Sequence, residues 1–463
     1  MPFLRCLVLL PLLILSTPVS AQTGLQAEVE TLLAQAGSGT RFGLLVVDSA
    51  GREIVAIHPD ERFQPASTTK LVTTAAAFAL LPVNDPDASG GAVVRLEGQD
   101  VVLEGHGDAR LSSAVDCTVD CLATLADAVA QRTRTVGDVI GDDRAFLDLR
   151  WSPGMGWNNI GTRSGAAVSA LTLDDNQAVV RIAPGDIGAT LRVEAPGLFA
   201  LDNRTATVAQ GAASVVLDRR PFDRTLHLRG AMPLGGAVVL RSVGLDDPAE
   251  GAAWRFRTML EARGVQVRGT VRVRHRSDAG EPAEGAGVVI ARLTPPPLAE
   301  DVRHTNKTSD NLHAELLLRR LGKGDIESGE KVVSALLVQA GVPRWSYSFA
   351  DGSGMSTYNR VTPRAMVTFL RWASGQPWGA AWWATLPVGG VDGTLSRRFR
   401  DGPLAGRLTA KTGTLAGTHA LAGTLQAASG AVLTFAFFAG DAPAEARPVP
   451  VMDAALALLA ARN

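Results

Sequence analysis

The sequence predicts an α/β protein in which a large β-rich insertion interrupts a domain of helices and strands. Alanine- and leucine-rich helical patterns, with strand candidates among them, lie toward both ends of the chain. From about residue 88 to residue 295, short β-type runs alternate with turns. Three short motifs begin at Ser67, Ser309 and Lys411, on both sides of that stretch. If they share one site, the chain must leave the catalytic domain after the first motif and return to it before the second.

The composition is that of an ordinary globular protein. With 463 residues, 46% of them apolar and 20% charged, the chain can form two or three domains with sizeable cores. A formal net charge of −1 gives no electrostatic reason to expect nucleic acid or an anionic membrane as the main partner. The seven histidines are scattered and form no H-E-x-x-H motif, so we expect no metal site and no cofactor.

The first 21 residues have the pattern of a secretory signal peptide. Arg5 supplies a positive charge, residues 7–15 are apolar apart from Pro11, and Val19-Ser20-Ala21 is a small-residue cleavage site. The apolar run is shorter than the roughly 20 residues that a membrane anchor needs. The sequence therefore predicts an exported protein with no integral membrane segment.

The elements that follow alternate in type up to the first motif. Helices are predicted over residues 25–36 and 67–81, and a β-hairpin over 43–47 and 53–57, with Ser49-Ala50-Gly51 at its turn. In the insertion, residues 252–263 are the one predicted helix, and Pro295-Pro296-Pro297 marks the end. Strands are predicted there at residues 92–96, 101–103, 189–193, 214–217, 225–228, 237–240 and 265–273.

The last third of the chain returns to helices. These are predicted at residues 310–321, 331–340, 363–373 and 444–461, with strands at 407–411 and 431–438. The last helix carries little positive charge, so we expect it to pack against a sheet rather than bind a membrane. The predicted organisation is a signal peptide (1–21), a discontinuous catalytic domain (22–87 and 296–463) and an inserted domain (88–295).

Two cysteines, Cys117 and Cys121, remain after removal of the predicted signal peptide. In an oxidising compartment a disulfide between them is favoured over two free thiols. Because that spacing would be strained on a regular helix, we expect the pair in a loop or a distorted turn.

Lysine is used sparingly in this chain. Only five of the 45 basic residues are lysine, and the others are arginine. Arginine almost never loses its proton, so a position that retains lysine is a candidate for proton transfer, although five lysines could also fall in these motifs by coincidence. Lys70 and Lys411 stand within two of the motifs, and Lys307 lies just ahead of the remaining motif, which begins at Ser309.

The first motif is Ser67-Thr68-Thr69-Lys70. At helical spacing, Ser67 and Lys70 share a face, so the lysine can activate the serine as a nucleophile. To act near neutral pH, the pKa of the lysine must fall from about 10.4 to about 7. Burial and a second cation, Lys411, could supply that change. On its own, this motif also occurs at the start of surface helices.

The second and third motifs contribute polar groups of complementary kinds. In Ser309-Asp310-Asn311, the serine can relay a proton, the asparagine can hold a substrate amide and the aspartate is structural; alone, the motif would be read as a helix N-cap. Lys411-Thr412-Gly413-Thr414 follows a strand, where glycine permits a close backbone approach. An extended peptide could add to that edge, with the N–H groups of Ser67 and Thr414 as an oxyanion hole. Alone, this motif is as readily an exposed strand end followed by a turn.

Together the three motifs resemble the set found in penicillin-binding proteins and serine β-lactamases. More of the chain is similar to the exported class C low-molecular-mass penicillin-binding proteins, which are D-alanyl-D-alanine carboxypeptidase/endopeptidases. The similarity runs in order through most of residues 40–425. It is carried by PASTTK (65–70), GHGD (105–108), VSAL (168–171), NKTSDN (306–311), DGSGMS (351–356), LPVGGVDGTL (386–395) and KTGTL (411–415).

This resemblance implies a transpeptidase/β-lactamase-like fold, with an antiparallel sheet flanked by helices. It implies a periplasmic enzyme that trims peptidoglycan stem peptides through an acyl-enzyme, and for which β-lactams are covalent inhibitors. Carried over by position, the catalytic residues are Ser67, Lys70 and Ser309, and the substrate contacts are Asn311, Lys411, Thr412 and Thr414.

Two other functions use the same residues differently. A serine β-lactamase has the same acylation step with faster deacylation, but compact enzymes of that kind lack such an insertion. A catalytically silent cell-wall binding protein would use the insertion as its interaction surface. Ala109 and Thr418-His419 depart from the family pattern, and they bear on substrate detail rather than on the reaction.

Overall fold

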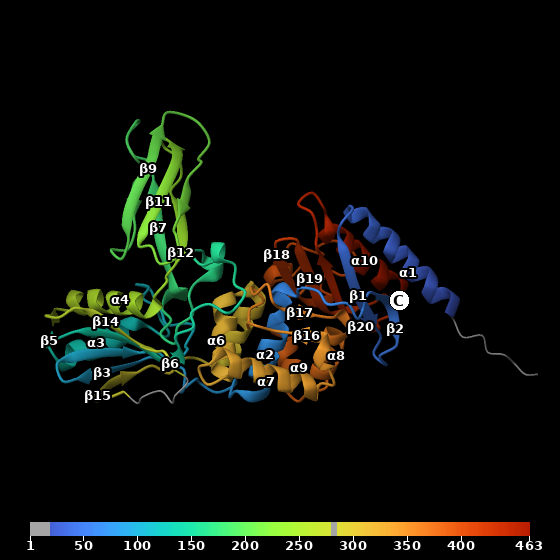
Figure 1. Ribbon diagram of the computed structural model, residues 1–463, viewed down its shortest axis with the longest axis horizontal. Coiled ribbons are helices and arrows are strands. Elements are labelled where there is room, and N and C mark those ends of the chain that lie inside the picture. The colour runs from blue at the N-terminus through green and yellow to red at the C-terminus, as the bar shows by residue number, and fades with distance from the viewer. Residues whose placement is uncertain (1–18, 279–284) are drawn as a thin grey trace, which may run out of the picture.

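The computed structural model describes residues 19–278 and 285–463. The first 18 residues of the predicted signal peptide therefore lie outside the described residues, and the first helix, α1 (Val19–Leu33), begins near the predicted cleavage site. Figure 1 shows a sheet-and-helix region beside a second region, from which a narrow β projection rises. Within the described ranges, no helix is long and apolar enough to cross a membrane.

The first region is built on a five-stranded antiparallel sheet in the order β18-β19-β20-β1-β2. Its apolar strands are buried on both faces: along β20, Phe435 and Phe437 enter one core, whereas Ala436 and Phe438 enter the other. The strands are β1 (Arg41–Val47), β2 (Glu53–Ile57), β18 (Leu408–Leu415), β19 (Thr418–Gln426) and β20 (Val432–Gly440).

Helices cover both faces of this sheet. On one face α1 packs beside α10 (Pro448–Arg462), whose Leu456 and Leu459 are buried, so the prediction that the last helix packs against a sheet is confirmed. The other face is covered by a helical layer in which Phe369 and Leu71 are fully buried. That layer contains α2 (Thr69–Leu80), α5 (Leu298–His304), α6 (Asn311–Leu321), α7 (Ile326–Gln339), α8 (Pro363–Ser374) and α9 (Gly379–Trp383).

The insertion is built on a mixed sheet in the order β14-β6-β4-β3-β15, covered by two helices. The prediction of a single helix here was wrong, because α3 (Leu122–Arg132) accompanies α4 (Pro248–Ala262); Leu122, Leu125 and Val129 of α3 are buried at helical spacing. The strands are β3 (Val93–Glu97), β4 (Asp100–Glu104), β6 (Val139–Leu147), β14 (Val271–Arg276) and β15 (Val288–Arg292). The short β5 (Thr135–Val136) pairs with β13 (Gln266–Val267).

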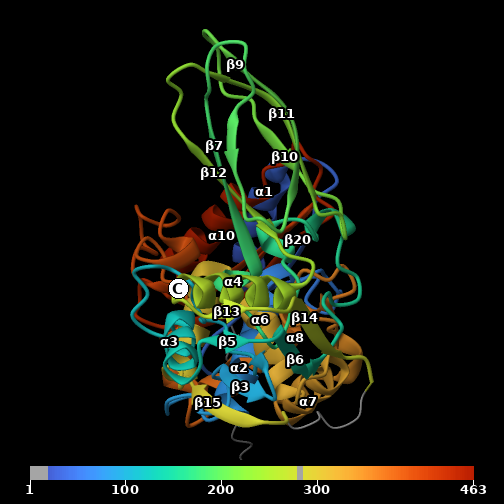
Figure 2. The same cartoon turned by 90° about the vertical axis from the view of Figure 1, so that its left-hand side faces the viewer.

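The projection consists of two three-stranded sheets packed around a small apolar core (Figure 2). The strand predicted at residues 189–193 begins only at Arg192, because the residues before it form a turn in which the N–H of Ala189 donates to the carbonyl of Asp186. The strands are β7 (Gln177–Ala183), β8 (Arg192–Glu194), β9 (Ala200–Val208), β10 (Val216–Asp218), β11 (Thr225–Pro233) and β12 (Val239–Gly244).

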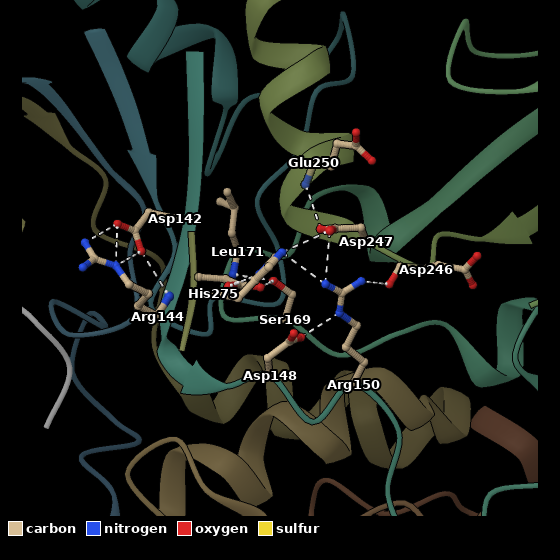
Figure 3. Close-up of polar contacts among 11 residues, drawn as sticks. Asp142, Arg144, Asp148, Arg150, Ser169, Leu171, Asp246, Asp247, Glu250 and His275 are labelled. Atoms are coloured by element: carbon tan, nitrogen blue, oxygen red, sulfur yellow. Dashed lines mark hydrogen bonds and ion pairs between the residues drawn. The ribbon is translucent and has the colours of Figure 1, made fainter. Parts of the chain in front are cut away.

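A charged junction network lies where α4 and β14 meet the loop after β6 (Figure 3). The imidazole of His275 lies between Asp143 and Asp247, 2.8 and 3.1 Å from their carboxylate oxygens. Arg150 donates to the carboxylates of Asp148 and Asp247. These side chains connect the insertion's mixed sheet to the base of the projection.

The five-stranded sheet draws on segments from both ends of the chain. Strands of the five-stranded sheet come from residues 41–57 and 408–440, on either side of the insertion. The boundaries at residues 88 and 295 themselves stay a prediction. Cys117 and Cys121 form a disulfide in the loop just before α3, with their Cα atoms 5.7 Å apart, and the pair is thus in a loop as expected.

Candidate active site

Ser67 lies in a 3₁₀ turn, Ala66–Thr68, immediately before α2, rather than in the helix itself. The turn is strained because Ala66 has a left-handed φ of 46°. Gly354 makes the strain possible, since a Cβ at that position would lie 1.9 Å from the carbonyl oxygen of Ala66. Gly413 of β18 is also close, and its Cβ would lie 3.0 Å from the backbone nitrogen of Ser67. The close backbone approach predicted for this glycine is therefore present.

Lys70 is fully buried beneath Ser67. Its Nζ donates to the Oγ of Ser67 at 3.1 Å, to the Oδ1 of Asn311 at 2.7 Å and to the carbonyl oxygen of Ser353 at 2.6 Å. An ammonium group has three hydrogens, so these contacts occupy all of its donors. The amine is thereby held on the serine that it would deprotonate.

Burial lowers the pKa of Lys70 to about 8, against the opposing effect of the carboxylates of Asp351, Asp310 and Glu315. Lys411, also fully buried, has a pKa well below its usual range because of burial and of repulsion by Lys70. We expected the second cation to act on Lys70. Burial is the main cause there, and the repulsion appears instead in the pKa of Lys411. A state in which Lys70 and Lys411 are both positively charged is therefore disfavoured near neutral pH.

Ser309, of the second motif, has a left-handed φ of 65°. Its Oγ accepts a hydrogen bond from the Nζ of Lys411 at 2.7 Å. The structure thus places Ser309 directly on Lys411, whereas the sequence suggested a relay beginning at Lys70. Asp310 caps α6 by accepting from the backbone N–H of His313 at 3.2 Å, which fits the structural role expected of it.

Asn311 joins the second motif to the first. Its Oδ1 accepts from Lys70, and its Nδ2 donates to the carbonyl oxygen of Ser164 at 2.9 Å. Both ends of the amide therefore contact the protein in this state. A substrate amide must compete with the Ser164 carbonyl for that Nδ2 group.

The third motif lies on β18, which is an edge strand of the sheet. The first half of its outer edge is occupied, because the backbone N–H of Ala410 donates to the carbonyl of Pro387 at 3.0 Å. Backbone groups alternate in direction along a strand, so the N–H groups of Thr412 and Thr414 point to the same side, beyond that pairing. The Oγ1 of Thr412 donates to the Oγ1 of Thr394 at 2.7 Å, and Thr414 is exposed.

Two buried carboxylates, to which the sequence analysis assigned no role, hold the backbone of residues 352–354 beside Lys70. Glu315 accepts from the backbone N–H groups of Gly352 and Ser353 at 3.0 and 2.9 Å. Asp351 accepts from the N–H of Gly354 at 2.9 Å. They fix the carbonyl that Lys70 contacts. Asp351 stands in the DGSGMS segment, which carries the family resemblance, and Glu315 lies four residues after the NKTSDN segment.

Lys307 makes different contacts from those of Lys70 and Lys411. Its Nζ donates to the carboxylate of Asp392 and to the carbonyl of Leu386, both at 2.6 Å. It therefore anchors the 386–395 segment, which supplies Thr394 to the wall beside β18.

A serine held on a buried lysine at the start of a helix, beside the edge strand of an antiparallel sheet, defines the class of penicillin-binding serine hydrolases. Residues 25–462 match the model of the D-Ala-D-Ala carboxypeptidase 3 (S13) family. The chain belongs to this family. It is accordingly a serine-type D-alanyl-D-alanine carboxypeptidase.

Relatives and solved structures agree with this assignment. The chain is 34% identical to the D-alanyl-D-alanine carboxypeptidase of Actinomadura sp. (strain R39), over 87% of this chain and 78% of that one. It is 29% identical to carboxypeptidase DacB of Mycolicibacterium smegmatis, over 96% and 85%. Penicillin binding protein 4 (dacB) from Haemophilus influenzae has the same fold, with a TM-score of 0.77 at 21% identity over 92% of this chain and 98% of that one.

Proposed function

We propose that Ser67 is the nucleophile and that Lys70 is its base. The observation that carries this proposal is the 3.1 Å contact between the Nζ of Lys70 and the Oγ of Ser67, on a lysine whose pKa is lowered to about 8. About a tenth of such a lysine is neutral at pH 7, which is enough for a general base. Arginine at this position could not act in the same way.

The reaction then follows from the surrounding groups. Ser67 attacks the carbonyl between two D-alanines of a peptidoglycan stem, and its proton passes to Lys70. The N–H groups of Ser67 and Thr414 hold the oxyanion. When the C–N bond breaks, the departing amine takes the proton that Ser67 gave to Lys70, relayed through Ser309, whose Oγ Lys411 contacts at 2.7 Å. Water then releases the shortened stem from the Ser67 ester and restores the hydroxyl.

Substrate orientation is assigned to the open end of β18. A stem peptide would add there as a further strand, with Thr412 and Lys411 at its terminal carboxylate and Asn311 on its amide. The same acyl site would accept a bulkier amine as leaving group, so cleavage of cross-links is a companion activity. A family of cell-wall enzymes and a signal-type N-terminus support an exported, periplasmic location.

Two measurements test these roles. Benzylpenicillin is expected to acylate Ser67, giving a mass increase of one drug molecule that disappears in Ser67→Ala. A Haemophilus influenzae structure with this fold was solved with a β-lactam bound, which supports the choice of probe. Absence of the adduct from folded wild-type protein would refute the assignment and favour a silent binding protein.

Digestion of purified muropeptides separates the remaining alternatives. Release of D-alanine from monomeric stems, and of monomers from cross-linked stems, is expected by chromatography. Rapid turnover of a cephalosporin without D-alanine release would instead indicate a serine β-lactamase.

A further inference from the structure

A cluster of imidazole and carboxylate groups lies at the N-terminal end of α6 and includes none of Ser67, Lys70 and Lys411. Ligand atoms of His304, Asp310 and His313 all lie within 4.8 Å of one another. The rings of His304 and His313 have centroids 4.8 Å apart. The Oδ1 of Asp175, from the insertion, lies 3.3 Å from the Nε2 of His313. Two imidazoles and the carboxylate of Asp310 thus converge, and Asp175 of the insertion lies beside His313.

The surroundings of His313 resemble those of a metal-binding histidine. The Nδ1 of His313 contacts the buried carboxylate of Asp301, so its Nε2 is the nitrogen that faces the cluster. A metal-bound histidine characteristically donates its other ring N–H to a carboxylate, which orients the ring and fixes its tautomer. The buried His313 is therefore aimed into the cluster, whereas His304 is exposed and can adjust its position.

The cluster also has an entry path. His304, His313 and Asp175 line a cavity of about 1130 Å³ between the insertion and α5/α6. The lining of the cavity also includes Trp254 and Arg255 of α4. An ion bound to the cluster would thus keep a coordination position open toward that cavity.

We propose that His304, His313 and Asp310 bind one divalent transition-metal ion of the zinc type, with Asp175 beside His313. Two imidazole nitrogens with carboxylate oxygens suit Zn²⁺ or Co²⁺, whereas Mg²⁺ prefers a set made of oxygens. No metal site was expected from the sequence, because His304 and His313 are nine residues apart and Asp175 comes from the insertion. Asp310 is the neighbour of Ser309, so the ion would hold the turn that carries this serine.

The test is titration of the chelator-treated full chain with ZnCl2 by calorimetry, with MgCl2 as the contrast. One equivalent of Zn²⁺ is expected to bind, and Co²⁺ in its place should give visible d–d bands of an N/O site. His304→Ala should weaken Zn²⁺ binding at least tenfold and abolish the bands. His304 is exposed, so its replacement should leave the fold intact, and circular dichroism verifies this.

A matched control is His227→Ala, which removes a single imidazole lying between Asp202 and Asp223. It should change the affinity less than twofold. The proposal is overturned if the wild type binds no Zn²⁺, or if His304→Ala binds it as tightly as the wild type does. These readouts do not depend on catalysis, so they can fail or succeed independently of the proposed roles of Ser67 and Lys70.

Discussion

The catalytic cleft and the junction network of the insertion both hold charged groups away from water, but they do so in opposite ways. In the cleft, the side chains of Lys70 and Lys411 are both buried, and burial lowers the pKa of each of them. In the junction network, His275 lies between Asp143 and Asp247, which raise its pKa to about 10. One region disfavours its charged forms and the other stabilises them.

The difference separates reactivity from stability. A buried charge without a close counter-ion is costly, so it persists where its altered pKa is used in a reaction. A charge surrounded by carboxylates stabilises the fold and has little tendency to give up its proton. Substitutions in the cleft are therefore expected to change rates, and substitutions in the junction network to change the free energy of unfolding.

The largest effect is expected from Lys70→Arg. The variant retains a positive charge and hydrogen-bond donors but cannot accept the proton of Ser67. Loss of a general base typically lowers a rate roughly 10²- to 10⁴-fold. The rate of benzylpenicillin acylation, measured by mass spectrometry, should fall within that range. Circular dichroism should show that the variant is folded.

The control for this substitution is Lys331→Arg, which makes the same change on an exposed lysine that pairs with Glu327. Acylation should proceed at the wild-type rate in the control. If Lys70→Arg were also acylated at the wild-type rate, Lys70 would not be the base. The statement that substitutions in the cleft change rates would then be contradicted.

The second expected effect is a pH dependence set by the cleft. The neutral form of Lys70 is the active form, and its pKa is about 8. The acylation rate should therefore rise with pH by roughly tenfold per unit below pH 8 and level off above it. Measurement from pH 6 to pH 9.5 with a fixed benzylpenicillin concentration tests this. A profile that falls over this range would indicate that a protonated group drives the rate-limiting step.

Gly354→Ala tests the support of the nucleophile rather than its chemistry. The added Cβ would lie 1.9 Å from the carbonyl of Ala66, so the turn that carries Ser67 must move. Misplacement of a reacting group by about 1 Å can lower a rate roughly 10²-fold, and we expect a loss of 10- to 100-fold in acylation. Gly430→Ala is the matched control, because Gly430 also has a positive φ (88°) but no atom within 4 Å of the new Cβ. Equal losses in the two variants would contradict this explanation.

The sequence predicted the cleft better than it predicted the insertion. Ser67 and Lys70 are three residues apart, so local spacing alone brought them together. The 3₁₀ turn at Ala66 was not predictable, because it depends on Gly354, which is distant in the sequence. The role of Asp351 likewise depends on a loop whose backbone it caps.

In the insertion the signals were weaker. The short helix α3 was missed because it lies among strand-like runs, and β6 was missed because it contains the polar run Gly141-Asp142-Asp143. His275 contacts Asp143, which is 132 positions away, and Asp247, which is 28 positions away on another element. Such contacts leave no periodic pattern in the sequence. The final helix was predictable because its apolar stripe is local.

The smallest expected effect is that of His275→Gln, which keeps a polar side chain but removes the charge between Asp143 and Asp247. Hydrogen bonds to charged groups contribute about 1.5–3 kcal/mol, and partial exposure of this site places the expected loss of unfolding free energy at about 1–2 kcal/mol. Because the folded-state pKa is raised from 6.5 to about 10, the stabilisation is fully present below pH 6.5 and is lost as the pH rises toward 10. Denaturant unfolding should therefore show the largest difference between wild type and variant at pH 6, and a smaller one at pH 9. The benzylpenicillin acylation rate should be unchanged, since the polar contacts of His275 are to Asp143, Asp247 and Arg150 and not to Ser67 or its lysines. A rate loss as large as that of Gly354→Ala would show that the two regions are coupled.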